Sequence, residues 1–282
     1  MNFQVAIYGM GRFGRALAGA LPAGSLARTG GRRDGVAAWK DLYRRGPEAF
    51  LKDLPGGTLV VLSVPDDALE TVANEFATLP GAGSLFFVHT SGVRGPEVLE
   101  PIADAGAQTG VLHLLQSFPP DGGAGLIRGC YGVVEGGPEL RACLSELAAG
   151  LGVITIELTD AQRVPYHAAA VLASNALVAM LDAGREMLES AGLPAEQAGK
   201  MLLPLARGTL HNVEKLGLHE ALTGPVVRGD VGTIRRHLGV LAGDARRTYV
   251  AMMLAVADTA ERSGRTPPNK LNEIRALLRE QP

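Results

Sequence analysis

The chain has little cysteine, little net charge and no motif for a metal. Its two cysteines, Cys130 and Cys143, form no C-x-x-C pair and have no histidine cluster nearby, which argues against a zinc site or a disulfide framework and favours two thiols in a reducing compartment. Lys and Arg number 27 against 29 for Asp and Glu, so the sequence predicts no broad positive field for nucleic acid or an anionic membrane. His219-Glu220 lacks the second histidine of H-E-x-x-H, and we expect no bound metal.

The chain also lacks a long uninterrupted apolar run. The longest apolar stretch, residues 168–181, contains Ser174 and Asn175 and is too short to span a bilayer. No charged segment followed by an apolar one precedes the first expected strand, as it would in a secretory leader. We therefore expect a cytoplasmic protein. Its 282 residues and 46% apolar content suffice for two globular domains of ordinary size.

What the sequence does have is a glycine-rich turn near its N-terminus. Residues 9–14 read G-M-G-R-F-G, after an apolar run at residues 3–8 and before a helical pattern at residues 15–21. In a dinucleotide-binding unit the first glycine permits the tight turn, the second lets the pyrophosphate approach the backbone, and the third lets the helix pack on the strand. The phosphates then contact free N–H groups at the helix N-terminus. The expected coenzyme residues of this turn are Gly9, Met10, Gly11, Arg12, Phe13 and Gly14.

The residues after the second expected strand bear on which coenzyme binds. NAD sites place an acidic residue about 20 residues beyond the glycines, whereas NADP sites offer arginine to the 2′-phosphate. Arg28 and Thr29 stand where the acid is expected, and Arg32 and Arg33 follow closely. Guanidinium groups make charge-assisted contacts with a phosphate dianion. Asp34 also falls at a suitable distance, but it follows a Gly-Gly turn typical of a solvated loop, so the sequence favours NADP(H) over NAD(H).

The hydrophobic pattern changes character after residue 158. Before it, apolar runs alternate with helical segments, as in a mainly parallel sheet that is covered on both faces. These runs include residues 59–64, 85–90, 111–115, 131–134 and 153–156. After it, helical periodicity takes over, with helices expected at residues 160–191, 195–216, 231–242, 244–263 and 269–279. The predicted fold class is α/β, with a doubly wound Rossmann-type sheet in residues 1–158 followed by an all-α domain in residues 159–282.

The carboxyl ends of parallel strands are where ligands lie in such sheets. Three segments follow strand ends, and we expect the first beside the nicotinamide-side ribose, the second beside the nicotinamide or the substrate, and the third beside the substrate. Their candidate residues are Val64, Pro65, Ser91, Gly92, His113 and Ser117. For Pro65 and Gly92, ordinary turn chemistry explains the residue equally well. For His113, the alternative is a loop histidine that is satisfied by its neighbours.

Polar side chains also interrupt an apolar stripe of the first long helix. His167 and Ser174 share one face, and Asn175 lies about 80° round from His167 at ~100° per residue. Buried polar groups need partners, which are either nearby backbone groups or a substrate in the cleft, and we favour the cleft. Arg228 lies in an irregular break between helices and is expected to hold an anionic substrate group or a partner subunit. Asp230 is expected to cap the next helix.

Taken together, these segments resemble a bacterial family of Rossmann-like proteins with a C-terminal helical domain of unknown function. The resemblance spans essentially the whole chain and rests on residues 9–14, 64–66, 89–92, 113, 117–119, 174–175 and 222–230. More distantly, the chain is similar to the superfamily of pyrroline-5-carboxylate reductase, 3-hydroxyisobutyrate dehydrogenase and 6-phosphogluconate dehydrogenase. That resemblance implies an N-terminal NAD(P) domain and a helical domain that builds a homodimer.

One departure separates the chain from the hydroxyacid dehydrogenases of that superfamily. Those enzymes carry a catalytic lysine four residues before an asparagine on the first long helix, and here that position is Val171, which cannot relay a proton. Lysine-assisted alcohol oxidation is therefore not expected. His167 or His113 remains as the proton donor in a reduction, because a histidine near its ordinary pKa can give up a proton as the hydride arrives.

The sequence therefore predicts an NADP(H)-dependent oxidoreductase that reduces a C=O or C=N bond of a small polar, anionic substrate. The residues expected to orient, hold or protonate the substrate are His167, His113, Ser117, Asn175, Ser91 and Arg228. The alternative is an NADP(H)-binding sensor or regulatory protein without turnover, which the missing lysine favours. The expected partners are the substrate and a second copy of the chain bound through the helical domain.

Overall fold

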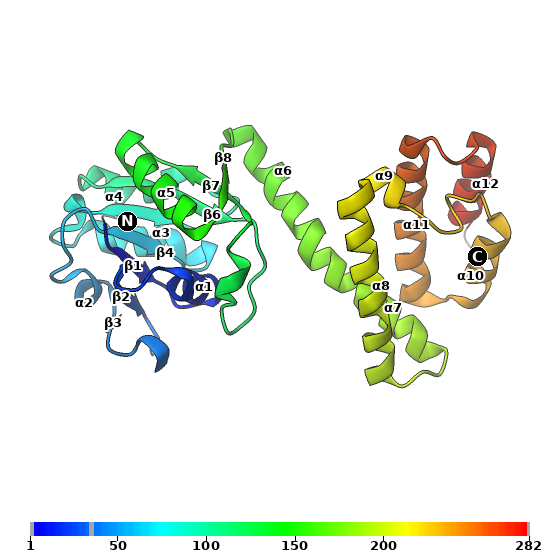
Figure 1. The fold of residues 1–282 in the computed structure, drawn as a ribbon, viewed down its shortest axis with the longest axis horizontal. Coiled ribbons are helices and arrows are strands. Elements are labelled where there is room, and N and C mark those ends of the chain that lie inside the picture. Colours follow the sequence, from blue (N-terminus) through cyan, green and yellow to red (C-terminus); the bar gives the residue numbers. More distant parts are fainter. Residues whose placement is uncertain (1–2, 34–36, 281–282) are drawn as a thin grey trace. The chain divides into compact units, whose positions relative to one another are not determined.

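The computed structural model describes residues 3–33 and 37–280. The chain divides into two compact units, Met1–Leu172 and Ala173–Pro282. The first contains the sheet, and the described part of the second contains helices joined by short loops (Figure 1). The predicted class, a Rossmann-type α/β sheet followed by an all-helical part, is confirmed.

The first unit is built on an eight-stranded sheet with the order β3-β2-β1-β4-β5-β6-β7-β8. Neighbouring strands are parallel except for β6 and β7, which are antiparallel. The direction in which strands are added changes between β1 and β4, which is where ligands bind in open α/β sheets. The strands are β1 (Val5–Tyr8), β2 (Leu26–Gly31), β3 (Tyr43–Arg45), β4 (Leu59–Leu62), β5 (Phe86–His89), β6 (Gln108–Leu114), β7 (Tyr131–Glu135) and β8 (Ile154–Ile156).

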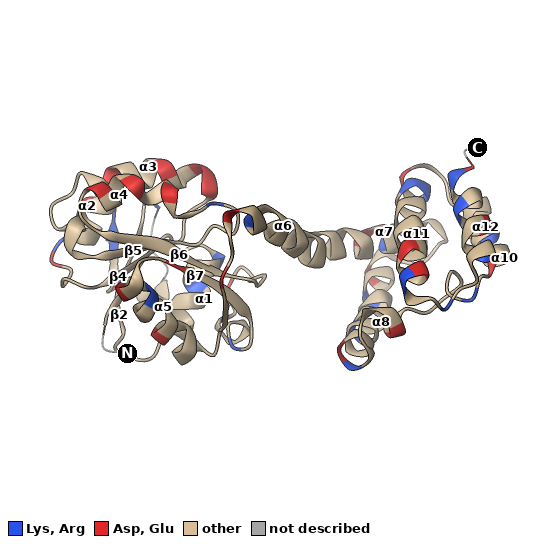
Figure 2. Ribbon diagram, turned by 90° about the horizontal axis from the view of Figure 1, so that it is seen from above, with Lys and Arg blue, Asp and Glu red and all other residues tan. Residues whose placement is uncertain are grey.

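Two layers of helices cover the sheet, one on each face (Figure 2). Alternate residues of a strand point to opposite faces, so Val5 and Ile7 pack in one core whereas Ala6 and Tyr8 pack in the other. The first core lies under α1 and α5, and the second lies under α2, α3 and α4. These helices are α1 (Arg12–Ala20), α2 (Pro47–Leu51), α3 (Asp66–Ala77), α4 (Glu100–Asp104) and α5 (Pro138–Leu151). Fully burying one of the large aliphatic side chains contributes about 2 kcal/mol.

The reversed strand β7 makes the chain return past the beginning of α1. The Phe118 ring stands edge-on to the Phe13 ring, with 5.7 Å between centroids. The Arg15 guanidinium donates through Nη1 to the carbonyl oxygen of Pro120 at 3.0 Å. The segment between β6 and β7 therefore braces the N-terminal turn of α1.

Helix α6 (Asp160–Val171) belongs to the first unit. Its Arg163 is buried and forms an ion pair with Glu135 at the end of β7. Its Tyr166 hydroxyl lies 3.0 Å from His113 Nδ1 on β6. These contacts join the first turns of α6 to β6 and β7, and the first compact unit runs to Leu172. The domain boundary expected between residues 158 and 159 stays a prediction.

The helix that begins with α6 continues to Ser190 through a π-helical segment, Leu172–Ala176, and α7 (Leu177–Ser190). The π segment contains both Ser174 and Asn175, and the Ser174 hydroxyl donates to Asn175 Oδ1 at 2.8 Å. Such π turns are rare and often occur at functional sites. The sequence predicted one helix over residues 160–191 but gave no sign of the π turn.

The second unit has its own small core, formed by α10, α11 and α12. Asp230 caps α10, because its carboxylate accepts a hydrogen bond from the Thr233 N–H at 2.9 Å, as the sequence predicted. The helices that follow α7 are α8 (Ala195–Leu216), α9 (Leu218–Ala221), α10 (Val231–Val240), α11 (Gly243–Ser263) and α12 (Pro268–Arg279). The expected helices match these apart from one or two residues at their ends and the short α9.

Candidate functional site

A cavity of about 490 Å³ lies at the carboxyl ends of β1, β2 and β4, beside the glycine-rich turn. Six of the predicted coenzyme residues line it, namely Gly9, Met10, Gly11, Arg32, Val64 and Pro65. Arg15, Arg33, Tyr8 and Tyr43 line it as well. The cavity therefore combines exposed backbone at a helix N-terminus with basic and aromatic side chains, as a dinucleotide requires.

Two glycines of the turn are required by the packing of the chain, whereas the third is not. A Cβ on Gly9 would lie 2.1 Å from the Ser63 carbonyl oxygen, and one on Gly14 would lie 2.1 Å from the Gly9 carbonyl oxygen. The chain's own packing therefore explains both. A Cβ on Gly11 would meet nothing within 4 Å, and the backbone there has φ −71°, which any residue adopts. Since the fold does not require a glycine at position 11, the open space beside it fits a ligand group that approaches the backbone.

The other residues of the turn do not line the cavity. Phe13 packs against Phe118, and Arg12, the first residue of α1, is exposed and does not line the cavity. Of the six residues predicted in this turn, the structure places Gly9, Met10 and Gly11 at the cavity.

The prediction for the end of β2 needs a correction. The strand runs past Arg28 and Thr29 to Gly31, so its carboxyl end presents Arg32 and Arg33 to the cavity. Thr29 is fully buried. Arg28 donates instead to the carbonyl oxygens of Phe50, at 2.7 Å, and Lys52 at the end of α2. Arg28 and Thr29 thus do not line the cavity, and Asp34, the acidic alternative, lies outside the described residues.

A second group of side chains gathers around Gly92, beyond the end of β5. A Cβ on Gly92 would lie 2.6 Å from His113 Nε2 and 2.9 Å from His167 Nδ1, so two imidazole nitrogens from β6 and α6 converge on one point. His167 Nδ1 is buried and has no hydrogen-bond partner among the described residues. The sequence predicted both histidines, and the structure brings them together, with ring centroids 6.5 Å apart.

The protonation of His113 follows from its surroundings. Burial, together with the nearby His167, lowers the pKa of His113 to about 4, so its imidazole is neutral near pH 7. Burial also raises the pKa of Tyr166 to about 12, so its hydroxyl keeps its proton. The Tyr166 hydroxyl and His113 Nδ1 share this hydrogen bond; when the phenol donates it, the proton of His113 lies on Nε2, the atom that faces Gly92. Sequence reasoning missed Tyr166, although it directly precedes His167.

The loop that carries Gly92 is held by its own hydrogen bonds. His89 is fully buried, accepts the Ser91 N–H at Nδ1 (3.2 Å) and contacts the Gly95 carbonyl oxygen through Nε2 (3.0 Å). The Ser91 hydroxyl donates to Asp66 Oδ2 at 2.9 Å and accepts the Arg94 N–H at 3.2 Å. The Ser91 hydroxyl is thus committed to the loop, which differs from the expected contact with substrate and coenzyme.

Ser117, a predicted substrate residue of the first unit, does not join this group. Ser117 is exposed and its backbone N–H donates to Gln116 Oε1 at 2.8 Å, while its hydroxyl bonds to neither histidine. Asn175 and Arg228 belong to the second unit, where both are exposed. Their part in a site stays a prediction.

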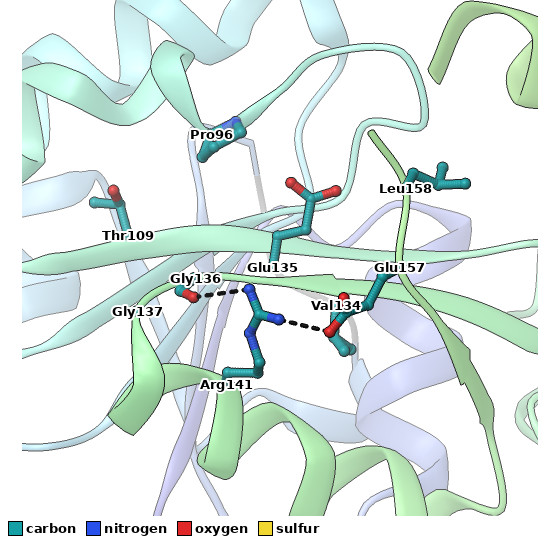
Figure 3. Close-up of a pocket in the computed structure, with 9 residues that line it drawn as sticks. All are labelled: Pro96, Thr109, Val134, Glu135, Gly136, Gly137, Arg141, Glu157 and Leu158. Carbon is teal, nitrogen blue, oxygen red and sulfur yellow. Dashed lines mark hydrogen bonds and ion pairs between the residues drawn. The ribbon is translucent and has the colours of Figure 1, made fainter. Parts of the chain in front are cut away.

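A further cavity of about 380 Å³ opens beside β7 (Figure 3). Its arginine is already paired, since Arg141 binds Glu157 Oε1 at 2.6 Å and the Gly136 carbonyl oxygen at 3.4 Å. No group of three or more acidic, histidine or cysteine side chains among the described residues is arranged to hold a metal.

Solved structures share this fold at low sequence identity. A Bacteroides fragilis protein assigned as an NADP oxidoreductase is 24% identical over 92% of this chain and 98% of its own, with a TM-score of 0.72. The pyrroline carboxylate reductase of Plasmodium falciparum with NADP bound is 13% identical over 98% of each chain, with a TM-score of 0.61. The reductive aminase of Aspergillus terreus in complex with NADPH is 13% identical over 99% of this chain and 93% of its own, with a TM-score of 0.56. These likenesses show the fold alone.

Family comparisons agree with the two parts of the chain. No curated protein gives a significant match. Residues 1–114 match the family model of a Rossmann-like domain, and residues 130–256 match that of a domain of unknown function (DUF2520). The resemblance inferred from the sequence motifs is confirmed: a Rossmann-like domain is followed in this chain by this domain of unknown function.

Proposed function

We propose that the chain is an NADP(H)-dependent oxidoreductase that reduces a C=O or C=N bond of a small polar, anionic substrate. The observation that carries the proposal is the open space beside Gly11 in a cavity lined by Arg32 and Arg33, because this cradle fits a pyrophosphate and a 2′-phosphate. Two relatives of the same fold hold NADP or NADPH, which supports the choice of coenzyme.

In this proposal Gly11 and the N-terminus of α1 hold the phosphates, and the nicotinamide end extends toward Gly92. The coenzyme supplies the hydride. His113 donates a hydrogen bond from Nε2 to the oxygen or nitrogen of the bond that is reduced, and Tyr166 is the positioning residue that fixes its tautomer. We assign the proton donor to His167, because its buried Nδ1 has no other partner among the described residues and converges with His113. His113 itself is a poor proton donor at neutral pH, since its pKa is near 4.

The test is binding followed by turnover. Isothermal titration calorimetry is expected to detect NADPH binding to the full chain. The decrease in NADPH absorbance is then followed across a panel of keto acids and cyclic imines that carry a carboxylate. Consumption of NADPH with at least one class supports the reductase. Tight binding without consumption across the panel would establish the sensor instead, and no binding by the folded protein would remove the coenzyme site.

We also propose that a second copy of the chain covers the apolar surface of the long helices. The helix Asp160–Ser190 is long and apolar enough to cross a membrane, yet its most apolar part is not buried within the chain. Leu172 and Val178 on this helix and Leu205 on α8 are each more than two-thirds exposed, at 69%, 68% and 68%. Apolar patches of this kind mark association surfaces.

Sedimentation velocity checks this association, and a dimer that persists at low micromolar protein is expected. A monomer at every concentration would overturn the proposal, as would flotation of the protein with lipid vesicles. The expected cytoplasmic location stays a prediction.

A further inference from the structure

Arg32, the residue that the corrected end of β2 presents to the cavity, is not a free cation. Its Nη2 forms an ion pair with Glu75 Oε1 on α3 at 2.6 Å, and the two side chains are 52% and 41% exposed. We propose that Glu75 sets the coenzyme preference by competing with the 2′-phosphate of NADP(H) for Arg32. This inference rests on the proposed coenzyme site and assigns a specificity residue that no sequence motif marks.

The positions of the other arginines point to Arg32 as the phosphate ligand. Among the described residues, the arginines that line the cavity are Arg15, Arg32 and Arg33. Arg15 is already used by the fold, since Nε donates to the Met10 carbonyl oxygen and Nη1 to the Pro120 carbonyl oxygen, both at 3.0 Å. Arg28 is turned toward the end of α2. Recognition of a 2′-phosphate therefore depends on Arg32 and Arg33, the two that follow β2.

Tyr8 is a second polar side chain at this end of the cavity. The side chain is only 1% exposed and lines the cavity, and its hydroxyl lies near the Arg32 guanidinium, which lowers its pKa although burial raises the pKa overall. The hydroxyl forms no well-aligned hydrogen bond to a described residue, so an acceptor that a ligand places at Arg32 would satisfy it as well. Tyr8 is the last residue of β1, whose register places it opposite Gly30 of β2, two residues before Arg32.

The charges decide the effect of Glu75. A phosphate dianion that approaches Arg32 meets a guanidinium whose charge is offset by the carboxylate, and it must displace Glu75 or bind beside it. A half-exposed ion pair is weak, so the phosphate can replace Glu75 as the partner of Arg32. Repulsion between the Glu75 carboxylate and the phosphate nevertheless reduces the binding free energy that the phosphate gains from Arg32. NADH carries a ribose hydroxyl in place of the phosphate and does not experience this repulsion. Glu75 therefore lowers the affinity for NADPH relative to that for NADH.

Calorimetric titration of Glu75→Gln with NADPH and NADH tests the proposal. Removal of the carboxylate is expected to lower the Kd of NADPH about tenfold and to leave that of NADH within about twofold, because only NADPH places a dianion next to the removed charge. Glu70→Gln is the matched control: it removes the same charge from an exposed position on the same helix, away from the ion pair. Glu70→Gln is expected to leave both Kd values unchanged.

The possible results distinguish a failure of the Glu75 proposal from a failure of the proposed coenzyme site. If neither coenzyme binds the folded parent protein, the proposed function fails. If NADPH binds but Glu75→Gln leaves its Kd unchanged relative to that of NADH, the competition is refuted. If Glu75→Gln instead raises the Kd of NADPH relative to that of NADH, the competition is also refuted, and Glu75 holds Arg32 in place for the phosphate. An equal gain in NADPH affinity in Glu70→Gln would also refute it, since the effect would then come from the general charge of α3.

Discussion

Replacement of Gly11 by alanine is expected to raise the Kd of NADPH about thirtyfold and to leave the melting temperature nearly unchanged. The added methyl group meets nothing within 4 Å in the protein and fits the observed backbone angles, so the fold tolerates it. It would occupy the space that we assign to the pyrophosphate, and crowding by one methyl group costs about 2 kcal/mol. Calorimetry measures the affinity, and thermal unfolding measures the stability.

Two further variants make the Gly11 result specific. Gly150→Ala adds a methyl group at an exposed helical position that also has no neighbour within 4 Å. It should change neither the Kd of NADPH nor the melting temperature by much. Gly14→Ala forces a Cβ to within 2.1 Å of the Gly9 carbonyl oxygen and should lower the melting temperature. Unchanged NADPH binding by Gly11→Ala would show that the turn does not hold the phosphates.

Replacement of Gly92 by alanine is expected to reduce kcat about a thousandfold with little change in NADPH affinity. The new Cβ would lie within 3.0 Å of nitrogen atoms of both His113 and His167, so both rings must move away from the point on which they converge. Loss of a positioned proton donor costs from about a hundredfold to ten-thousandfold in rate, and coenzyme phosphates held at Gly11 are unaffected. The measurement is kcat with a substrate found in the panel of keto acids and imines.

A spectroscopic readout distinguishes displaced histidines from a damaged fold. The side-chain nitrogen resonances of His113 and His167 should shift in Gly92→Ala, whereas that of His237, which contacts Tyr249 in the second unit at 2.7 Å, should stay in place. Tyr166→Phe should change the tautomer of His113 without moving His167. Wild-type kcat in Gly92→Ala would remove the histidine pair from the reaction.

Most of the fold could be predicted because its signals are local. The glycine turn follows a short apolar strand, and buried strands alternate with helices. Glycine or proline ends many of the helices. Each of these signals can be recognised within a few residues of sequence. The π turn at residues 172–176 could not be predicted, since the apolar pattern continues through it. The short edge strand Tyr43–Arg45 was missed for the opposite reason: its three residues are half-buried or exposed and show no apolar run.

The site was only partly predictable, because contacts between distant segments decide it. His113 and His167 were found from their types and positions, but that both converge on Gly92 depends on how α6 packs against β6. Arg28 is an arginine at the expected position, yet its guanidinium reaches carbonyl groups more than 20 residues away. Glu75 is equally invisible from the sequence, since nothing near it on α3 indicates that it meets Arg32.

The antiparallel strand β7 has a consequence for the order in which the protein matures during synthesis. The glycine turn leaves the ribosome well before Pro120, yet Arg15 in its helix is anchored to that residue, 105 positions later. Domains fold as units once their distant contacts can close. A nascent chain that stops short of Phe118 would therefore carry every residue of the turn but not the brace behind it, and we expect a competent nucleotide pocket only after that return segment has emerged.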